Sequence, residues 1–96
     1  MSEFSISFDK NFLRKIKKIY KRDKSLYKRY RTFLIKFSEN PFYPGLNTHK
    51  VTVSGYGRVY SSTITGDIRV IWNLEENYVL LLLDIGGHEG STKVYR

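Results

Sequence analysis

The sequence contains no cysteine, and it holds only two histidines and two prolines. Without cysteine there can be no disulfide framework, no thiol nucleophile and no thiolate zinc site. Neither the histidines nor the carboxylates fall into HExxH or any other metal-binding spacing, so we expect no metal and no cofactor. The sequence also lacks a P-loop and a GxSxG nucleophile motif, and "GGHEG" is too short for a dinucleotide loop.

Long hydrophobic runs are absent too. The longest, Tyr78 to Leu83, is far shorter than the ~20 residues of a membrane-spanning helix. The N-terminus "MSEFSISFDKNF" has no basic region followed by an apolar region, so it does not read as a signal peptide. We expect a cytoplasmic protein with no membrane partner, and the lack of cysteine fits a reducing compartment.

The 96 residues are 41% hydrophobic and 16% aromatic, which is typical of a folded chain with a real core. This length predicts one domain, residues 1–96, without a second lobe or a deep enclosed pocket. Any functional site is therefore expected on an open surface.

Positive charge is concentrated in the first third of the chain. Residues 1–36 hold twelve Lys and Arg against three acidic residues, whereas residues 37–96 hold five against six. Clustered cations favour a polyanionic partner, nucleic acid before anionic lipid, because binding releases counterions. The alternative is that the cations only keep two helix surfaces soluble.

Hydrophobic periodicity predicts one strand, two helices and then four strands. Asp9 is the expected N-cap of the first helix, and Asn40-Pro41 must end the second. We therefore expect an α+β fold in the order β-α-α-β-β-β-β, with a two-helix hairpin covering one face of an antiparallel sheet that the first strand joins. The predicted strands are 4–8, 50–53, 58–65, 68–74 and 78–85, and the predicted helices are 10–22 and 24–38.

Hairpin arithmetic places the unusual residues together. A third turn centred near Glu76 pairs Arg69 near Leu83 and puts His88 just beyond the end of the sheet. The second turn, at Gly66-Asp67, sets Arg69 opposite Ile64, and the first turn brings the start of the 50–53 strand to a nearby level. The side chains expected to gather at one end of the sheet are His49, Lys50, Asp67, Arg69 and His88.

This set of side chains suits the cleavage of RNA. The RNA 2′-hydroxyl can attack the adjacent phosphorus once a general base removes its proton and a general acid protonates the departing 5′-oxygen. His88 is our first candidate for acid/base work because imidazole titrates near neutral pH. Arg69 would stabilise the additional charge of the transition state with its forked donors.

Each candidate also has a structural interpretation. His88 can cap a strand end in solvent, and Arg69 can pair with Asp67 or Asp84. Asp67 can be an ordinary turn residue, and His49-Lys50 an ordinary start of a strand. Tyr60, Trp72 and Tyr78 are more often found in sheet or core contacts than as platforms for stacked bases.

Three segments, "NPFYPGLNTHKV", "GRVYSSTITGDIRVIW" and "VLLLLDIGGHEGSTKVYR", give the chain a family resemblance. With two helices before them, the chain resembles the RelE/ParE superfamily of type II toxins over nearly its whole length. Within that superfamily it is similar to the RelE- and YafQ-like mRNA interferases. The resemblance implies a small endoribonuclease that cuts messenger RNA on the ribosome and is held inactive by a cognate antitoxin.

The resemblance also assigns residues. His88 matches the C-terminal histidine used for acid/base catalysis, and Arg69 and Asp67 match the arginine and acidic residue of the "gdyRviw" pattern. His49-Lys50 match the "hkl" segment near the substrate, and Tyr95 matches the C-terminal aromatic residue. The basic helices would face ribosomal RNA, with Lys17, Lys18 and Lys21 as contacts.

The chain departs from the family pattern in two places. Thr63 stands where many relatives carry arginine or histidine, so Arg58 or Arg69 would have to supply that phosphate contact. The segment "EGSTK" also lengthens the distance from His88 to Tyr95. Two alternatives therefore stay open: a ParE-like inhibitor of DNA gyrase that does not need His88, and a degenerate member that only binds antitoxin or nucleic acid.

Overall fold

The computed structural model describes residues 4–87, and in this range it contains five strands, two α-helices and two short 3₁₀ turns. The predicted α+β element order is confirmed, and the element boundaries agree to within two residues. The strands are β1 (Ser5–Phe8), β2 (His49–Val53), β3 (Gly57–Thr63), β4 (Arg69–Glu75) and β5 (Val79–Gly86); the helices are α1 (Lys10–Arg22) and α2 (Lys24–Glu39), and the 3₁₀ turns are η1 (Pro44–Leu46) and η2 (Glu76–Tyr78).

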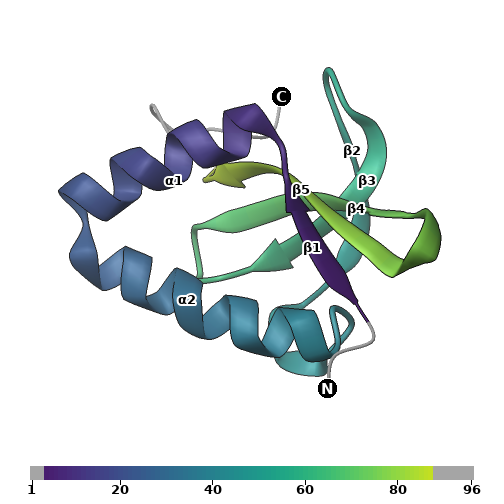
Figure 1. Cartoon of the computed structure of the whole chain (residues 1–96), viewed down its shortest axis with the longest axis horizontal. Helices are drawn as coiled ribbons and strands as arrows, with labels where there is room; N and C mark the ends of the chain where they lie inside the picture. The colour runs from purple at the N-terminus through teal and green to yellow at the C-terminus, as the bar shows by residue number, and fades with distance from the viewer. Residues whose placement is uncertain (1–3, 88–96) are drawn as a thin grey trace.

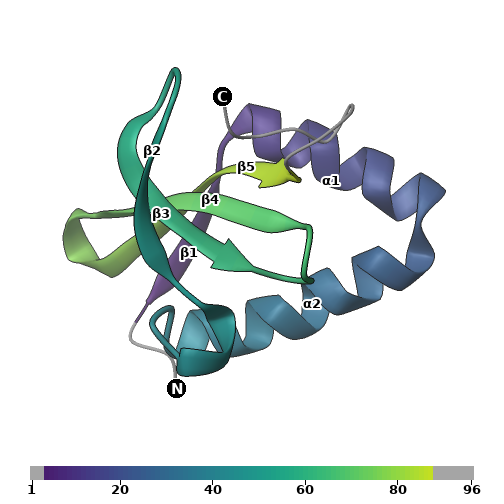
Figure 2. The same ribbon diagram turned by 180° about the vertical axis from the view of Figure 1, so that it is seen from behind.

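The strands form one sheet in the order β1-β5-β4-β3-β2. The expected antiparallel meander runs from β2 to β5, and β1 joins it in parallel beside β5, which makes the sheet mixed. The two helices lie on one side of the sheet, and the ends of β3 and β5 point into the space between them (Figure 1). In the described part of the chain, neither α-helix lies on the other face of the sheet (Figure 2).

A single residue, Asp23, joins the two helices. Its backbone N–H donates to the Ile19 carbonyl at the end of α1, and its carboxylate accepts from the Leu26 N–H at the start of α2. Asp9 caps the start of α1 as predicted, because its side chain accepts from the Asn11 N–H at 2.9 Å. These bonds satisfy backbone groups that helix ends leave without partners.

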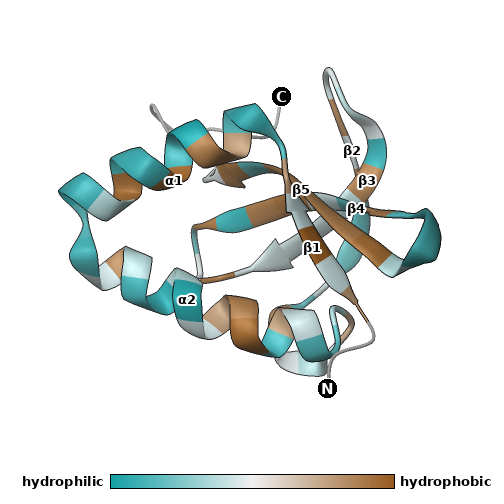
Figure 3. Cartoon of the chain, viewed as in Figure 1, coloured by the Kyte–Doolittle hydropathy of each residue, from teal (hydrophilic) through white to brown (hydrophobic). Residues whose placement is uncertain are grey.

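The main core lies between the helices and the sheet, and a smaller one lies on the opposite face of the sheet. Hydrophilic residues dominate the outer surface of α1, whereas β5 is mostly hydrophobic (Figure 3). β5 is an inner strand of the sheet, and its unbroken apolar run is typical of a strand that is covered on both faces. The buried residues of the main core are Phe12, Tyr30, Phe33, Phe37, Leu46, Val70, Trp72, Leu80, Leu82 and Ile85; those of the smaller core are Val53, Val59 and Ile71.

Trp72 is fully buried at the centre of the main core. Its ring stacks on Tyr60 with centroids 4.6 Å apart and meets Phe37 edge-on at 5.0 Å. Its indole N–H donates to the Ser62 hydroxyl at 2.8 Å, and the Ser62 hydroxyl lies 2.6 Å from that of Thr48. Because Thr48 donates to the Pro41 carbonyl, the Ser62 proton must point to Thr48.

The pairing of β4 with β5 differs from the predicted one. Arg69 pairs with Gly86, three residues beyond the expected Leu83. Glu75 pairs with Val79, so the turn is centred on Asn77 and not on Glu76. Moving the centre of a hairpin by one residue shifts the pairing by two residues. Leu83 is skipped by a β-bulge between the Ile71–Asp84 and Trp72–Leu82 pairs, which accounts for the third. The correction moves Arg69 opposite the end of β5.

Burial of Tyr30 should make the free energy of unfolding decrease at alkaline pH. Tyr30 is 4% exposed, and its pKa is raised by desolvation and, secondarily, by Tyr27. The unfolded chain loses this proton above about pH 10 while the folded chain keeps it, so stability present below that pH is lost as pH rises. Urea unfolding between pH 8 and 11 should show this decline, and Tyr30→Phe should flatten it. An unchanged decline in Tyr30→Phe, relative to the exposed control Tyr78→Phe, would contradict this prediction.

Within residues 4–87, neither helix combines the length and apolar character required to cross a bilayer.

Candidate functional site

The end of the sheet formed by the end of β3, the start of β4 and the end of β5 brings part of the predicted site together. Thr63 pairs with Arg69, and Arg69 pairs with Gly86. Asp67 lies in the β3–β4 turn just before β4, and Gly87 lies against it. His88 follows Gly87 in the sequence, but His88 and Tyr95 lie outside the described residues.

Arg69 is partly buried and is held by its own hairpin. Its Nη1 group donates to the Thr63 hydroxyl at 3.1 Å and to the Thr65 carbonyl at 3.5 Å. Both bonds use one nitrogen, and a guanidinium also carries donors on Nη2 and Nε. The two bonds fix the position of the Arg69 side chain. The N–H groups on Nη2 and Nε are additional donors of a kind suited to binding a phosphate.

Asp84, the other predicted partner of Arg69, is paired elsewhere. Its carboxylate lies 2.6 Å from the Lys15 ammonium of α1 and accepts from the Ile85 N–H. Asp84 is 7% exposed, so Lys15 neutralises a nearly buried charge. The pair joins α1 to the end of β5.

His49 is exposed at the start of β2 and pairs with Ser61. His49 lies in register with Ile71 of β4 through Ser61, and Arg69 is two residues from Ile71, so strand alternation puts His49 and Arg69 on the same face of the sheet. By sheet geometry their Cα atoms are about 12 Å apart. Its Nδ1 lies 2.8 Å from the Asn47 carbonyl, which can only accept. Nδ1 therefore carries a proton, and in the neutral ring the lone pair of Nε2 is left to act as a base.

Lys50 and Arg58 lie apart from this end of the sheet. Lys50 pairs with Tyr60, and alternation places it on the face opposite to His49, where its ammonium lies 5.4 Å from the Tyr60 ring centroid. Arg58 pairs with Thr52 near the β2–β3 turn, five residues or roughly 17 Å along β3 from Thr63. The structure therefore does not group Arg58 with Asp67 and Arg69.

A cationic pocket lies between α1, the start of α2 and the end of the sheet. It has a volume of about 470 Å³, an apolar side that includes Ile68 and Ile85, and a border at Gly86. Lys18 is the predicted α1 cation that lines it, whereas Lys17 and Lys21 are exposed and do not belong to its lining. The cations in its wall are Arg14, Lys15, Lys18 and Arg22.

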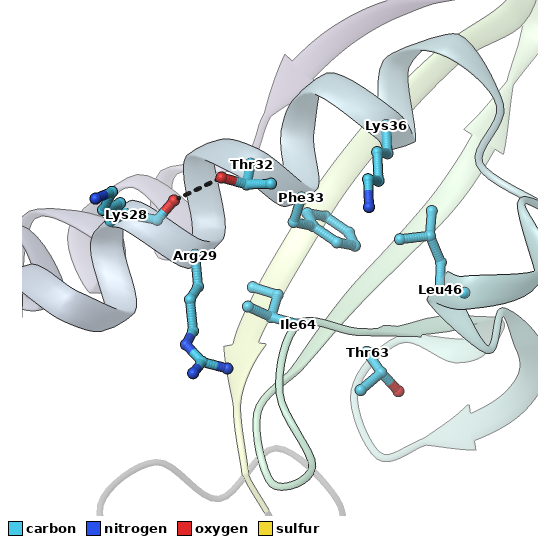
Figure 4. A pocket seen from close by; sticks show the side chains of 9 residues that line it. Lys28, Arg29, Thr32, Phe33, Lys36, Leu46, Thr63 and Ile64 are labelled. Carbon is cyan, nitrogen blue, oxygen red and sulfur yellow. Dashed lines mark hydrogen bonds between the residues drawn. The ribbon is translucent and has the colours of Figure 1, made fainter.

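A second cationic pocket, of about 320 Å³, lies between α2, the η1 turn and the end of β3. Arg29 and Lys36 both project from α2 to the side on which Ile64 and Leu46 lie (Figure 4). Thr63 lines this pocket and also accepts from Arg69, so the pocket adjoins the end of the sheet. Its cations are Lys28, Arg29 and Lys36.

Sequence reasoning missed most of these wall cations, although their spacing carries a signal. Arg14, Lys18 and Arg22 are four residues apart and form one stripe of α1. The i, i+4, i+8 rule that located the hydrophobic face could have located this stripe, provided that its neighbour in the fold was known.

Gly87 lies so near Asp67 that it leaves no room for a side chain. A Cβ built there would lie 2.9 Å from Asp67 Oδ2 and 3.1 Å from its carbonyl oxygen. Gly87→Ala should therefore displace the chain from Asp67 and lower the unfolding free energy by about 1–3 kcal/mol. Gly66→Ala is the matched control in the adjacent turn, since no atom of residues 4–87 lies within 4 Å of its added Cβ. Equal unfolding midpoints in urea for the two variants would show that the contact is unimportant.

Comparison with known proteins identifies the fold. No family model matches the chain, and no curated protein matches it. Among solved structures, it is similar to a chain of the archaeal RelE-RelB complex from Pyrococcus horikoshii, with 18% identity, a TM-score of 0.70 and coverage of 93% of this chain and 99% of that one. A YoeB/ParE toxin from Agrobacterium tumefaciens gives 10% identity, a TM-score of 0.74 and coverage of 90% and 100%.

A chain of the DinJ-YafQ toxin-antitoxin complex from E. coli gives 19% identity, a TM-score of 0.67 and coverage of 90% and 93%. The chain therefore has the fold of the RelE, YoeB and YafQ toxins, as its sequence resemblance predicted. The similarity spans nearly the full length of each chain.

Proposed function

We propose that this chain is the toxin of a type II toxin-antitoxin pair and that it cleaves messenger RNA. The observation that carries the proposal is the end of the sheet at Asp67 and Arg69, which lies between two cationic pockets. A single RNA strand crossing this end would find a fixed guanidinium at the centre and ammonium or guanidinium groups on both sides. The shared fold with RelE and YafQ toxins supports the same function.

The proposed reaction needs only side-chain chemistry. A base takes the proton of the 2′-hydroxyl, the 2′-oxygen bonds to the adjacent phosphorus, and the bond from phosphorus to the 5′-oxygen breaks. An acid protonates that oxygen, leaving a 2′,3′-cyclic phosphate and a 5′-hydroxyl. We assign acid/base work to His88 with His49 as its counterpart, transition-state stabilisation to Arg69, and orientation of the site to Asp67.

Lys50 and Arg58 have a different role in this proposal. Both lie away from Arg69, so they would contact the flanking RNA and not the reacting phosphate. Lys18 would bind a flanking phosphate in the α1 pocket, while the exposed Lys17 and Lys21 would contact ribosomal RNA. Tyr95 would stack near the cleaved nucleotide.

An antitoxin partner belongs to the same proposal. RelE and YafQ were both solved in complexes, with RelB and DinJ respectively. The cationic pockets of this chain would suit an acidic, flexible antitoxin segment that covers the site. The pockets and the end of the sheet would then be closed to RNA in the complex.

Induced expression tests the proposal. Growth should stop, translated messages should acquire cuts ending in 2′,3′-cyclic phosphate, and co-expression of an adjacent short acidic open reading frame should restore growth. Cleavage of a purified message with and without ribosomes would show whether ribosomes are needed. DNA breaks and an SOS response with intact messages would instead support gyrase inhibition, and the absence of both effects would support a chain that only binds.

A further inference from the structure

Two tyrosine rings beside the second pocket share an unusual arrangement. Tyr43 is 47% exposed, and the Lys36 ammonium lies 5.9 Å from its ring centroid. Tyr60 is half-buried, and the Lys50 ammonium lies 5.4 Å from its ring centroid. Each ring therefore has a cation above one face, in contact with solvent.

Each ring also packs against a neighbour in the protein. Tyr60 stacks on the buried Trp72 with an interplanar angle of 20°. Tyr43 lies against Gly45, where an added Cβ would come within 3.2 Å of its Cε1 atom. Phe42 links the two rings, since it immediately precedes Tyr43 in the loop and its ring meets that of Tyr60 edge-on at 5.5 Å. The rings are thus held in place before any ligand arrives.

The surroundings are strongly positive. Residues 24–38 of α2 contain five Lys and Arg and no acidic residue, and this stretch lies between Asp23 at the N-cap and Glu39 at the end of the helix. Among residues 4–87, no carboxylate lines the pocket formed by Lys28, Arg29 and Lys36. Thr63 connects this pocket to Arg69 through a hydrogen bond.

We propose that Tyr43 and Tyr60 form a stacking platform for two bases of a single RNA strand, with Lys36 and Lys50 turning from the rings to the flanking phosphates. The proposal rests on the proposed function for its substrate class. It adds a binding site for nucleotides that flank the reacting phosphate. Supported aromatic faces bordered by cations are what unpaired bases require. A duplex would not fit, because its bases are hidden in the stack.

Fluorescence anisotropy with a labelled ten-nucleotide 2′-O-methyl RNA tests this platform. The methyl group blocks the attacking hydroxyl, so the measurement reports binding without cleavage. Tyr43→Ala should raise the Kd by roughly 5- to 100-fold, the range expected for one stacked base, and Tyr43→Trp should restore it. Tyr78→Ala is the matched control, because Tyr78 is 60% exposed in the η2 turn beside Glu75 and Glu76.

Salt dependence separates stacking from charge. Lys36→Gln should reduce the slope of log K against log salt by about 0.7, as for one phosphate contact to a single strand, whereas Tyr43→Ala should leave the slope unchanged. The platform is overturned if the wild-type protein does not bind the single strand, if Tyr43→Ala binds like Tyr78→Ala, or if a duplex binds equally well. If Tyr43-dependent binding occurs but expression causes no message cleavage, the result supports the stacking platform and contradicts the proposed enzymatic function.

Discussion

His88→Ala should slow message cleavage by about 10²–10⁴-fold, the usual contribution of one general acid or base. The residue follows Gly87, which lies against Asp67, and the preceding residue, Gly86, pairs with Arg69. Because the substitution removes the imidazole and adds no bulk, the free energy of unfolding should change little. The measurement is the rate of appearance of cut ends in a translated message.

The pH dependence of this rate provides a second readout. If His88 acts as acid or base, the limb of the pH–rate profile with a pKa near that of histidine should disappear in His88→Ala. Glu76→Ala is the control, because Glu76 lies in the turn at the opposite end of β5. Wild-type cleavage by His88→Ala would remove His88 from the mechanism, and a comparable loss in His49→Ala alone would transfer the role to His49.

Trp72→Ala should lower the unfolding free energy by about 3–5 kcal/mol, the range for removal of a large buried aromatic side chain. The substitution removes contacts with Phe37 and Tyr60 and takes away the indole donor to Ser62. For a domain of this size, such a loss is a large fraction of the total stability. Urea unfolding followed by circular dichroism measures it.

Two further variants divide this effect into parts. Trp72→Phe keeps much of the ring contact but loses the N–H donor, so it should cost less than Trp72→Ala. Ser62→Ala leaves the buried indole N–H without its acceptor and should cost about 1–3 kcal/mol. A loss below 1 kcal/mol in Trp72→Ala would mean that the core closes around the gap or does not depend on this ring.

The sequence predicted the elements well because their signals are local. The limits of α1 follow from an apolar period and from Asp9 and Asp23, each of which caps a helix through a hydrogen bond to a residue no more than four positions away. Predicting where Arg69 and Lys50 lie in the fold would have required knowledge of the strand pairing, which depends on residues far apart in the sequence. The bulge at Leu83 and the three-residue turn at Asn77 shift the β4–β5 pairing, and neither has a clear sequence signature.

In the candidate site, too, local features could be predicted from the sequence, whereas features that depend on strand pairing or helix packing could not. Adjacent residues of a strand point to opposite faces, so His49 and Lys50 could not both join Arg69 on one face. The period-two rule was available from the sequence, but it settles the outcome only once the register is known. The wall cations Arg14 and Arg22 depended on the docking of α1 against the end of β5, which the Lys15–Asp84 pair helps to fix.

The use of Asp23 as the cap of both helices restricts how this chain can change length during evolution. An insertion of one residue beside it would turn α2 by about 100° around its own axis and shift it along that axis by about 1.5 Å. Lys28 and Lys36 would then leave the pocket wall, and Phe33 and Phe37 would leave the core. Insertions and deletions should therefore be tolerated in the exposed η2 turn and selected against at the junction of the two helices.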